Sequence, residues 1–217
     1  MTSSPPSSEP VILAYPFRGR WRTRNSPARR VPSHGTHLMG TTYAIDFVPV
    51  DEHGRSGPRG WRAAFATEAP ERFHGFGRPV LAPLDGTVVA VLDGEPDHEA
   101  RRSQLTLVAY MLTQARRVRG GPAAIAGNHV VIARTTQGPY VLLAHLRRGS
   151  VAVRVGDRVP RGAVVGACGN SGNSTQPHVH VQVTDTTRWD TARGLPIAFS
   201  GPDGRATVPR ESEIVSV

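Results

Sequence analysis

Two histidines stand one residue apart in the segment STQPHVHVQV, residues 174–183. In a β-strand the side chains at positions i and i+2 point to the same face. The alternation therefore predicts a strand in which His178, His180 and Gln182 share one face, while the intervening valines fill the other. Such a pair of histidines is either a solvent-facing polar stripe or a metal or catalytic site on a rigid strand, and the rest of the chain must decide between them.

Further candidates for chemistry lie far from this pair in the sequence. His145 ends the apolar segment LLAH, and Asp46 follows the apolar segment YAI. An ionisable side chain in an apolar strand is costly unless it is paired or bound to a cation. Upstream of Asp46, the segment SHGTHLMG holds two more histidines, His34 and His37. Taken together, these residues make a purely structural explanation of the H-x-H pair less convincing.

Histidine and carboxylate side chains are ligands that suit Zn²⁺, and a catalytic zinc site needs three protein ligands with an open position for water. One histidine upstream of Asp46, Asp46 itself and one histidine of the H-x-H pair would supply that set. A water bound to zinc has its pKa lowered to about 7 and becomes a nucleophile. The other histidine of the pair and His145 would then handle protons and the developing oxyanion. Because H-E-x-x-H does not occur, the helix-based metalloprotease arrangement is excluded.

The elements that must position these residues are predicted to be strands. The chain has 217 residues, with 23 Gly and 19 Pro that interrupt it too often for a helical bundle. Short valine-rich runs at regular spacing favour a mainly β fold, either a sandwich or a barrel. Strands are expected within the ranges 11–25, 43–50, 72–97, 128–135, 140–147, 162–169 and 178–185. Residues 98–121 break the pattern and are predicted to be an insertion, either a short helix or a long loop.

Charge and cysteine content narrow the possible partners. The net charge is +9, and all 26 basic residues are arginine. A basic surface suits an anionic partner such as nucleic acid, a membrane face or an acidic wall polymer. The arginines are scattered in pairs without interleaved aromatic residues, which argues against nucleic acid. A single cysteine, Cys168, excludes an intrachain disulfide and a cysteine zinc knuckle, and its valine-rich surroundings favour a small buried filler.

The ends of the chain are predicted to lie outside the main domain. Residues 1–10 are polar and rich in Pro and Ser, which is typical of a disordered tail, and they have neither the basic nor the apolar region of a signal peptide. No segment approaches the length of a transmembrane span. We therefore expect a main domain over residues 11–200, with the insertion near 98–121 and a C-terminal tail over 201–217.

The combined motifs YAIDF, PVLAPLDGTVVAV, GNHVVIA and LLAHLRRGSVAVRVGDRVPRGAVVGACGNSGNSTQPHVHVQV resemble those of the lysostaphin/LytM-type zinc metallopeptidases. The resemblance covers roughly residues 32–184, and the range 127–183 is its most specific part. It implies an antiparallel β-sheet peptidase domain of the duplicated hybrid-motif type. It also implies one Zn²⁺ at the floor of a groove and cleavage of peptide cross-links or stem peptides of bacterial peptidoglycan. The location that it implies is outside the cytoplasm or in the cell wall.

The resemblance also assigns roles to individual residues. Asp46 and His180 match metal ligands, and His178 and His145 match catalytic histidines. The remaining ligand is His34, because SHG is similar to the H-x-G neighbourhood of related sequences, with His37 as the alternative. Segments that shape the groove wall in the family correspond to positions here that we expect to contact substrate: Asn128, Asn170 and Ser174.

Two other functions are compatible with parts of this pattern. A non-catalytic wall-binding or regulatory module would keep the groove and lose the zinc, and the metal content of the purified protein separates it from the enzyme. A phosphocarrier of the sugar phosphotransferase type also uses a duplicated hybrid motif and a pair of histidines. That function leaves Asp46 without a purpose.

Overall fold

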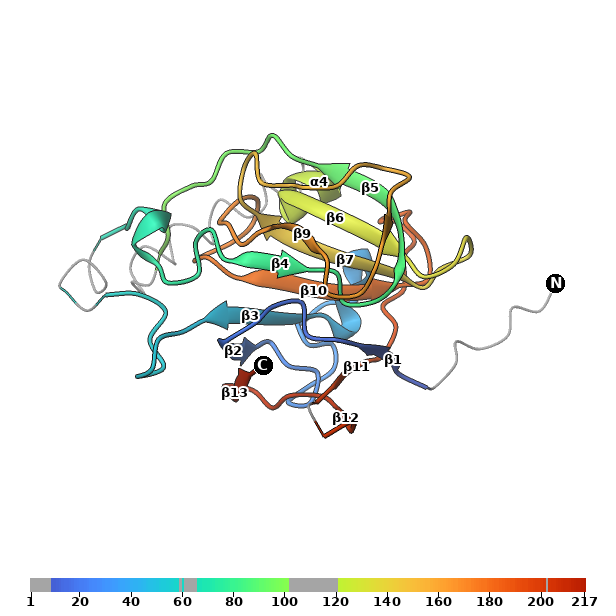
Figure 1. Ribbon diagram of the computed structural model, residues 1–217, viewed down its shortest axis with the longest axis horizontal. Helices are drawn as coiled ribbons and strands as arrows, with labels where there is room; N and C mark the ends of the chain where they lie inside the picture. Colours follow the sequence, from blue (N-terminus) through green and yellow to red (C-terminus); the bar gives the residue numbers. More distant parts are fainter. Residues whose placement is uncertain (1–8, 59, 61–65, 102–120, 202) are drawn as a thin grey trace.

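The structure is a computed structural model, and it describes residues 9–58, 60, 66–101, 121–201 and 203–217. The predicted N-terminal tail therefore lies almost entirely outside the described residues, and so does most of the predicted insertion at 98–121. Within the described part, strands predominate and the helices are short (Figure 1).

An eight-stranded antiparallel sheet forms the centre of the fold, in the order β13-β2-β3-β10-β7-β6-β5-β8. Its strands are β2 (Arg20–Arg24), β3 (Ile45–Pro49), β5 (Gly86–Leu92), β6 (Asn128–Ala133), β7 (Tyr140–Leu146), β8 (Arg158–Val159), β10 (Val179–Thr184) and β13 (Ile214–Ser216). Strand β10 lies between β3 and β7 and pairs antiparallel with both (Figure 1). This arrangement brings residues near 46, 144 and 180 together, although they are distant in the sequence.

Two smaller sheets complete the β structure. Strand β1 (Val11–Leu13) pairs parallel with β11 (Ile197–Ser200), which pairs antiparallel with β12 (Ala206–Thr207). Strand β4 (Pro79–Leu81) pairs antiparallel with β9 (Val164–Ala167). The fold is thus mainly β and mainly antiparallel, which confirms the predicted fold class.

The described helices are a 3₁₀ segment η1 (Leu38–Tyr43), a 3₁₀ turn η2 (Pro70–Arg72) and a short α-helix α4 (Gly121–Ala126). None of the helices in the described ranges has the length and apolar character needed to cross a membrane. The helical segment that matters for the site is η1, because it follows the loop that carries His34 and packs near β10.

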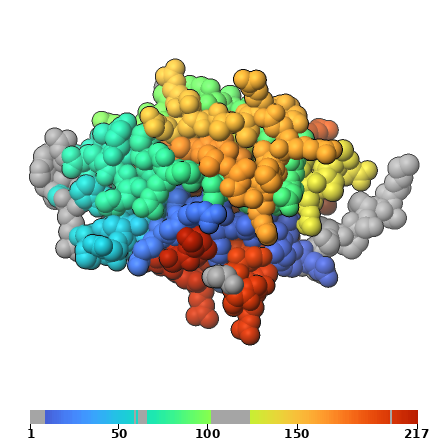
Figure 2. Space-filling model, viewed as in Figure 1, coloured from blue at the N-terminus to red at the C-terminus, as the bar shows by residue number. Residues whose placement is uncertain are grey.

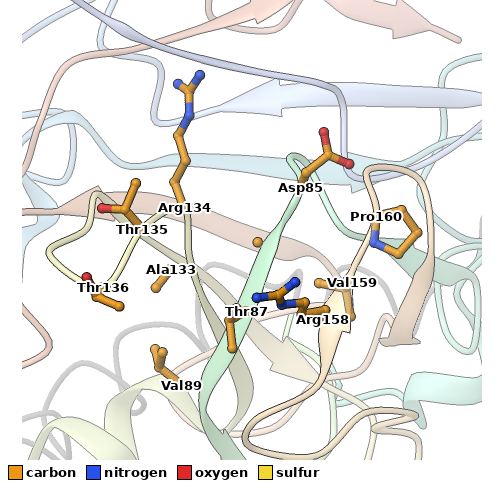
Figure 3. A pocket seen from close by; sticks show the side chains of 11 residues that line it. Asp85, Thr87, Val89, Ala133, Arg134, Thr135, Thr136, Arg158, Val159 and Pro160 are labelled. Carbon is orange, nitrogen blue, oxygen red and sulfur yellow. The ribbon is translucent and has the colours of Figure 1, made fainter.

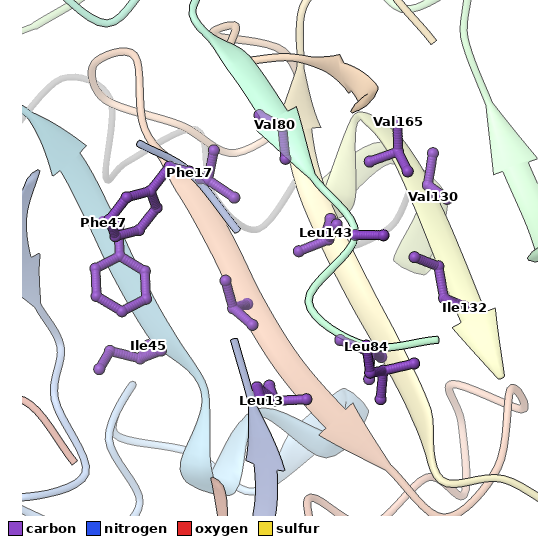
Figure 4. Packing of buried hydrophobic residues seen from close by; sticks show 14 of the residues in the cluster. Leu13, Phe17, Ile45, Phe47, Val80, Leu84, Val130, Ile132, Leu143 and Val165 are labelled. Carbon is purple, nitrogen blue, oxygen red and sulfur yellow. The ribbon is translucent and has the colours of Figure 1, made fainter. Parts of the chain in front are cut away.

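The core lies under one face of the large sheet. Because side chains alternate along a strand, every second side chain points into this core. Val179, Val181 and Val183 of β10 belong to this core, as predicted. Ile45 and Phe47 of β3 and Leu143 of β7 lie on the same side, and Figure 4 shows them packed with residues of the neighbouring sheets. Because the apolar residues occupy this face, the intervening side chains of β3, β7 and β10 are left for the opposite face, which carries the site.

The predicted C-terminal tail, residues 201–217, contains two short strands. Strand β12 extends the small sheet, and β13 pairs with β2 at the edge of the large one. Figure 2 shows these last residues against the N-terminal segments. Short strands are expected in this Pro- and Gly-rich end of the chain, and their pairing makes it part of the folded body, because the edge of β2 supplies hydrogen-bonding groups for β13.

Candidate active site

The site lies where β3, β10 and β7 run side by side. Residue His180 of β10 is directly opposite Asp46 of β3 on one side and Ala144 of β7 on the other. Directly opposite residues of an antiparallel pair have neighbouring side chains on the same face. The register therefore places the histidine and the carboxylate in contact on the face that points away from the core.

Three side chains converge here: those of His34, Asp46 and His180. The Nδ1 atom of His180 lies 2.9 Å from Asp46 Oδ1, and the Nε2 atom of His34 lies 3.2 Å from Asp46 Oδ2. Their potential ligand atoms all lie within 4.8 Å of one another. Among the described residues, this is the group of histidine, cysteine and acidic side chains that could hold a metal ion.

A loop returns His34 to the sheet from twelve residues upstream of Asp46. The backbone N–H of Ser33 donates to Thr42 O at 2.9 Å, and the Ser33 hydroxyl donates to Thr41 O at 3.2 Å. These bonds close the segment between Ser33 and Thr42 into a compact loop. Because the loop folds back on itself, His34 lies beside Asp46 although twelve residues separate them in the sequence.

The alternative ligand, His37, is not brought to the carboxylate. Its side chain is exposed, and its Nδ1 atom lies 3.1 Å from the Thr42 hydroxyl. Between the two histidines, the structure brings only His34 to Asp46. The choice of His34 as third ligand is therefore the one that fits the geometry.

Polar neighbours orient the side chains of Asp46 and His180. The amide of Asn25 donates to Asp46 Oδ2 at 2.7 Å. The far nitrogen of His180, Nε2, lies 3.0 Å from Gln182 Oε1, and the Gln182 amide in turn donates to Met39 O at 3.0 Å. Partners of this kind fix the ring orientation of metal-binding histidines. Nothing local in the sequence around Asn25 indicates its role, because the contact depends on the pairing of β2 with β3.

The other two histidines, His145 and His178, lie beside this group with a defined tautomer. His145 Nδ1 lies 3.0 Å from the carbonyl of Ser171, and His178 Nδ1 lies 2.8 Å from the carbonyl of Gln176. A carbonyl can only accept, so Nδ1 carries the proton in each ring and Nε2 keeps its lone pair. The two rings are 4.7 Å apart, and His178 Nε2 lies 3.7 Å from Asp46 Oδ1.

Burial and charge set the protonation of these groups. Burial raises the pKa of Asp46, but His34 and His178 beside it, with hydrogen bonds from His180 and His34, lower it by more, so the pKa lies well below 3.8. Burial lowers the pKa of His178, and it lowers that of His145 well below 6.5. For His180 the effect of burial is outweighed by the bond to Asp46 and its charge, so the pKa is raised. At neutral pH the site thus has an ionised carboxylate and two neutral histidines.

A cavity of about 420 Å³ opens over the group and contains all five side chains of the site. Its other walls mix apolar and polar side chains and come mainly from η1, α4, β7 and the segments before and after β10; the large apolar ones are Leu38, Ile125, Leu142 and Trp189. A second, larger cavity of about 640 Å³ lies between β5, β6 and β8, and Figure 3 shows its arginines, threonines and Asp85. None of the described residues that line the second cavity is a histidine, whereas four histidines line the first.

The three residues expected to contact substrate are fully buried. Asn128 and Asn170 direct their amides to backbone groups, and Ser174 lies 3.0 Å from His178 Nδ1 and donates to Gln176 O. None of the three lines the cavity. Because all three side chains are buried and lie outside this lining, the structure places them behind the wall of the cavity, where Ser174 also contacts the His178 ring.

Comparison with known proteins agrees with the motifs. Residues 113–191 match Peptidase family M23, a range that includes His145, His178 and His180 and begins after Asp46. The chain is 28% identical over 214 residues to the peptidoglycan DD-endopeptidase ShyA of Vibrio cholerae. The alignment covers 94% of this chain and 43% of ShyA, so the chain spans less than half of the length of that relative. The resemblance to the LytM-type peptidases is confirmed.

Solved structures similar to this chain include two catalytic domains. That of lysostaphin from Staphylococcus simulans has a TM-score of 0.40 at 19% identity and covers 73% of this chain and 80% of its own. That of the prophage-encoded M23 protein EnpA from Enterococcus faecalis has a TM-score of 0.37 at 22% identity and covers 65% and 81%. Because both TM-scores are below 0.5, the resemblance to LytM-type peptidases rests on the family match and the sequence relative.

Proposed function

We propose that this chain is a zinc-dependent endopeptidase that cleaves peptide cross-links or stem peptides of peptidoglycan. One observation carries the proposal: His34, Asp46 and His180 present their donor atoms to one another at the floor of a cavity that also holds two neutral histidines. The family match and the peptidoglycan endopeptidase relative support the substrate class.

The donor set fits a zinc ion in number and in chemistry. His34, Asp46 and His180 supply two imidazole nitrogens and one carboxylate, as catalytic zinc sites with three protein ligands do. The carboxylate is 6% exposed and surrounded by histidines, an arrangement that a cation would stabilise. When bound, a zinc ion supplies Lewis-acid chemistry that activates water and polarises a peptide carbonyl.

The catalytic residues in this proposal are His178 and His145. His178 presents an unprotonated Nε2 next to the ligand group, so it can accept a proton from an attacking water and return it to the leaving amine. The ring of His145 contacts the ring of His178, and its Nε2 is also unprotonated. A proton held on either ring would stabilise the negative charge that develops on the substrate carbonyl oxygen.

The proposal is tested by digesting purified peptidoglycan and reading the products by mass spectrometry. We expect new amino and carboxyl ends within peptide segments, lost when a chelator is added and regained when zinc is restored. A variant with His178→Gln serves as the inactive control. Binding to peptidoglycan without release of peptides would instead identify a wall-binding or regulatory module.

A further inference from the structure

The face that carries the candidate metal site continues past Asp46 onto strand β2. In the pairing of β2 with β3, Arg24 lies opposite Asp46 and Arg22 lies opposite Val48. Trp21 and Thr23 point into the protein and are fully buried, so the arginines that alternate with them point to the site's face. Of these arginines, Arg22 and Arg24 lie opposite β3 residues of the face that carries the candidate metal ligands.

These arginines border a cavity of about 290 Å³, which we call the arginine cavity; it is lined by Arg22, Arg24, Val48, Val50, Ser56, Arg101, Thr175 and Gln176. Of the described residues in this lining, three are arginines and none is acidic. Its apolar part comes from Val48 of β3, the strand that also carries Asp46, and from Val50 just after that strand. Thr175 lines both the arginine cavity and the active-site cavity, so the two are neighbours along one surface.

The described contacts of the two β2 arginines leave donors for a ligand. Arg22 Nη2 donates to the neutral carbonyl of Gly54 at 2.7 Å. Arg24 Nη1 lies 3.7 Å from Glu211, which is outside the lining, and donates to the Ser212 hydroxyl at 3.3 Å. Each guanidinium has five N–H donors in a planar fork, so these contacts use only part of its capacity.

Arg101 approaches the arginine cavity from a different segment. Its backbone N–H donates to Thr175 O at 2.6 Å, and its Nη1 donates to Glu99 O at 3.0 Å. The first bond ties this arginine to the residue shared by both cavities. Positive charge therefore reaches the cavity from β2 on one side and from the segment before residue 102 on the other.

We propose that the arginine cavity binds a carboxylate of the peptide whose scissile bond lies at the candidate metal site, so that the protein prefers anionic peptides. This inference rests on the proposed function, because it concerns the substrate of the same site. Guanidinium groups bind carboxylates through paired, charge-assisted hydrogen bonds. A carboxylate on a peptide extending across β3 would meet the arginines beside Asp46. The net charge of +9 favours the same class of ligand.

The test uses two synthetic stem peptides of the same sequence, one with free side-chain and terminal carboxylates and one with carboxamides in their place. Binding of each to the chelator-treated full chain is measured by titration calorimetry. We expect the carboxylate peptide to bind roughly tenfold more tightly, as charge-assisted hydrogen bonds predict, and the preference to shrink as salt is added.

The variants Arg22→Gln, Arg24→Gln and Arg101→Gln should each reduce this preference several-fold. Arg158→Gln, which removes an exposed arginine of the cavity between β5, β6 and β8, is the matched control and should keep it. Thermal unfolding of each variant identifies any that is misfolded. Since Arg101 and β2 lie in different segments, one damaged variant still leaves others that decide the question.

Equal binding of the two peptides by the wild-type chain overturns the inference, as does an equal loss of preference in Arg158→Gln. Hydrolysis is scored separately, with zinc restored. Cleavage of both peptides at the same kcat/KM would leave the proposed peptidase standing and remove the arginine cavity from its specificity. Selective binding without any cleavage would keep the arginine cavity and contradict the peptidase.

Discussion

His178 and His180 occupy neighbouring places on one strand face, but their hydrogen bonds give them different tasks. His180 Nδ1 points to Asp46, whereas His178 Nδ1 is held by the Gln176 carbonyl and leaves Nε2 toward the cavity. His178→Gln should therefore lower kcat by a factor on the order of 100 or more, as loss of a general acid–base group does, while bound zinc stays at the wild-type level. Peptide hydrolysis and metal analysis of the same preparation measure both quantities.

The control for that variant is His53→Gln, because His53 is exposed and lies against Glu52, away from the cavity. It should leave both kcat and zinc content unchanged. Loss of zinc from His178→Gln would make this residue a ligand and would contradict the proton-transfer role.

His34 and His37 form a second matched pair at the scale of single residues. Only His34 reaches the carboxylate of Asp46, and His37 is exposed against Thr42. His34→Ala should lose zinc on dialysis because two ligands remain, whereas His37→Ala should keep it. Mass-spectrometric metal analysis after dialysis gives the two values. The reverse result would assign the third ligand to His37.

The loop between His34 and Asp46 depends on a glycine that cannot be replaced freely. Gly40 has a φ of +75°, and a Cβ added there would clash with Thr184 Cγ2 of β10. Gly40→Ala should push η1 away from β10, disturb the Met39 carbonyl that holds Gln182, and weaken zinc binding. The overpacking should also lower the free energy of unfolding by about 1–3 kcal/mol, beyond the cost of the backbone conformation.

Gly149→Ala is the matched control for this element. Its φ is +71°, and no atom lies within 4 Å of the added Cβ. It should carry only the backbone penalty of about 1 kcal/mol and leave zinc affinity unchanged. Urea unfolding and zinc titration compare the two variants. Equal effects of the two substitutions would show that the contact between η1 and β10 has no part in holding the site.

At the scale of strands and loops, the sequence predicts the strands well and the loops poorly. Alternation along residues 179–183 and the apolar segments before His145 and Asp46 identify β10, β7 and β3, because core-facing valines and leucines leave a readable period. The return of His34 through a long loop, and the contact of Asn25 with Asp46, depend on strand pairing across the sheet. The burial of Asn128, Asn170 and Ser174 likewise follows from packing that a motif does not encode.

Across the whole molecule, an aromatic cluster joins the small sheet of β1 and β11 to the large one. Tyr15 stacks on Phe199 of β11 with centroids 4.9 Å apart and meets Phe47 of β3 edge-on at 5.9 Å. Burial, with the nearby charge of Glu213, raises the pKa of Tyr15 to about 12, against the opposing bond with Thr207. The cluster therefore favours the neutral phenol in the folded state.

This shift predicts a dependence of stability on alkaline pH. Below pH 10 both states keep the Tyr15 proton, so the full contribution is present. Between pH 10 and about 12 the unfolded chain loses the proton while the folded protein retains it, so stability falls as pH rises. In Tyr15→Phe the decline in the urea midpoint from pH 8 to pH 11 should be smaller than in the wild type. An identical decline in both would show that folding does not raise the pKa of Tyr15.

The account as a whole stands on the convergence of His34, Asp46 and His180 on one cation, which calorimetric titration of zinc into the chelator-treated chain tests most directly. We expect one ion per chain for the wild type and for Asp85→Asn, an exposed aspartate of the other cavity. Asp46→Asn, which keeps the shape and removes the charge, should bind zinc far more weakly. A wild-type chain that takes up no zinc, or an Asp46→Asn variant that binds it equally well, would contradict the account.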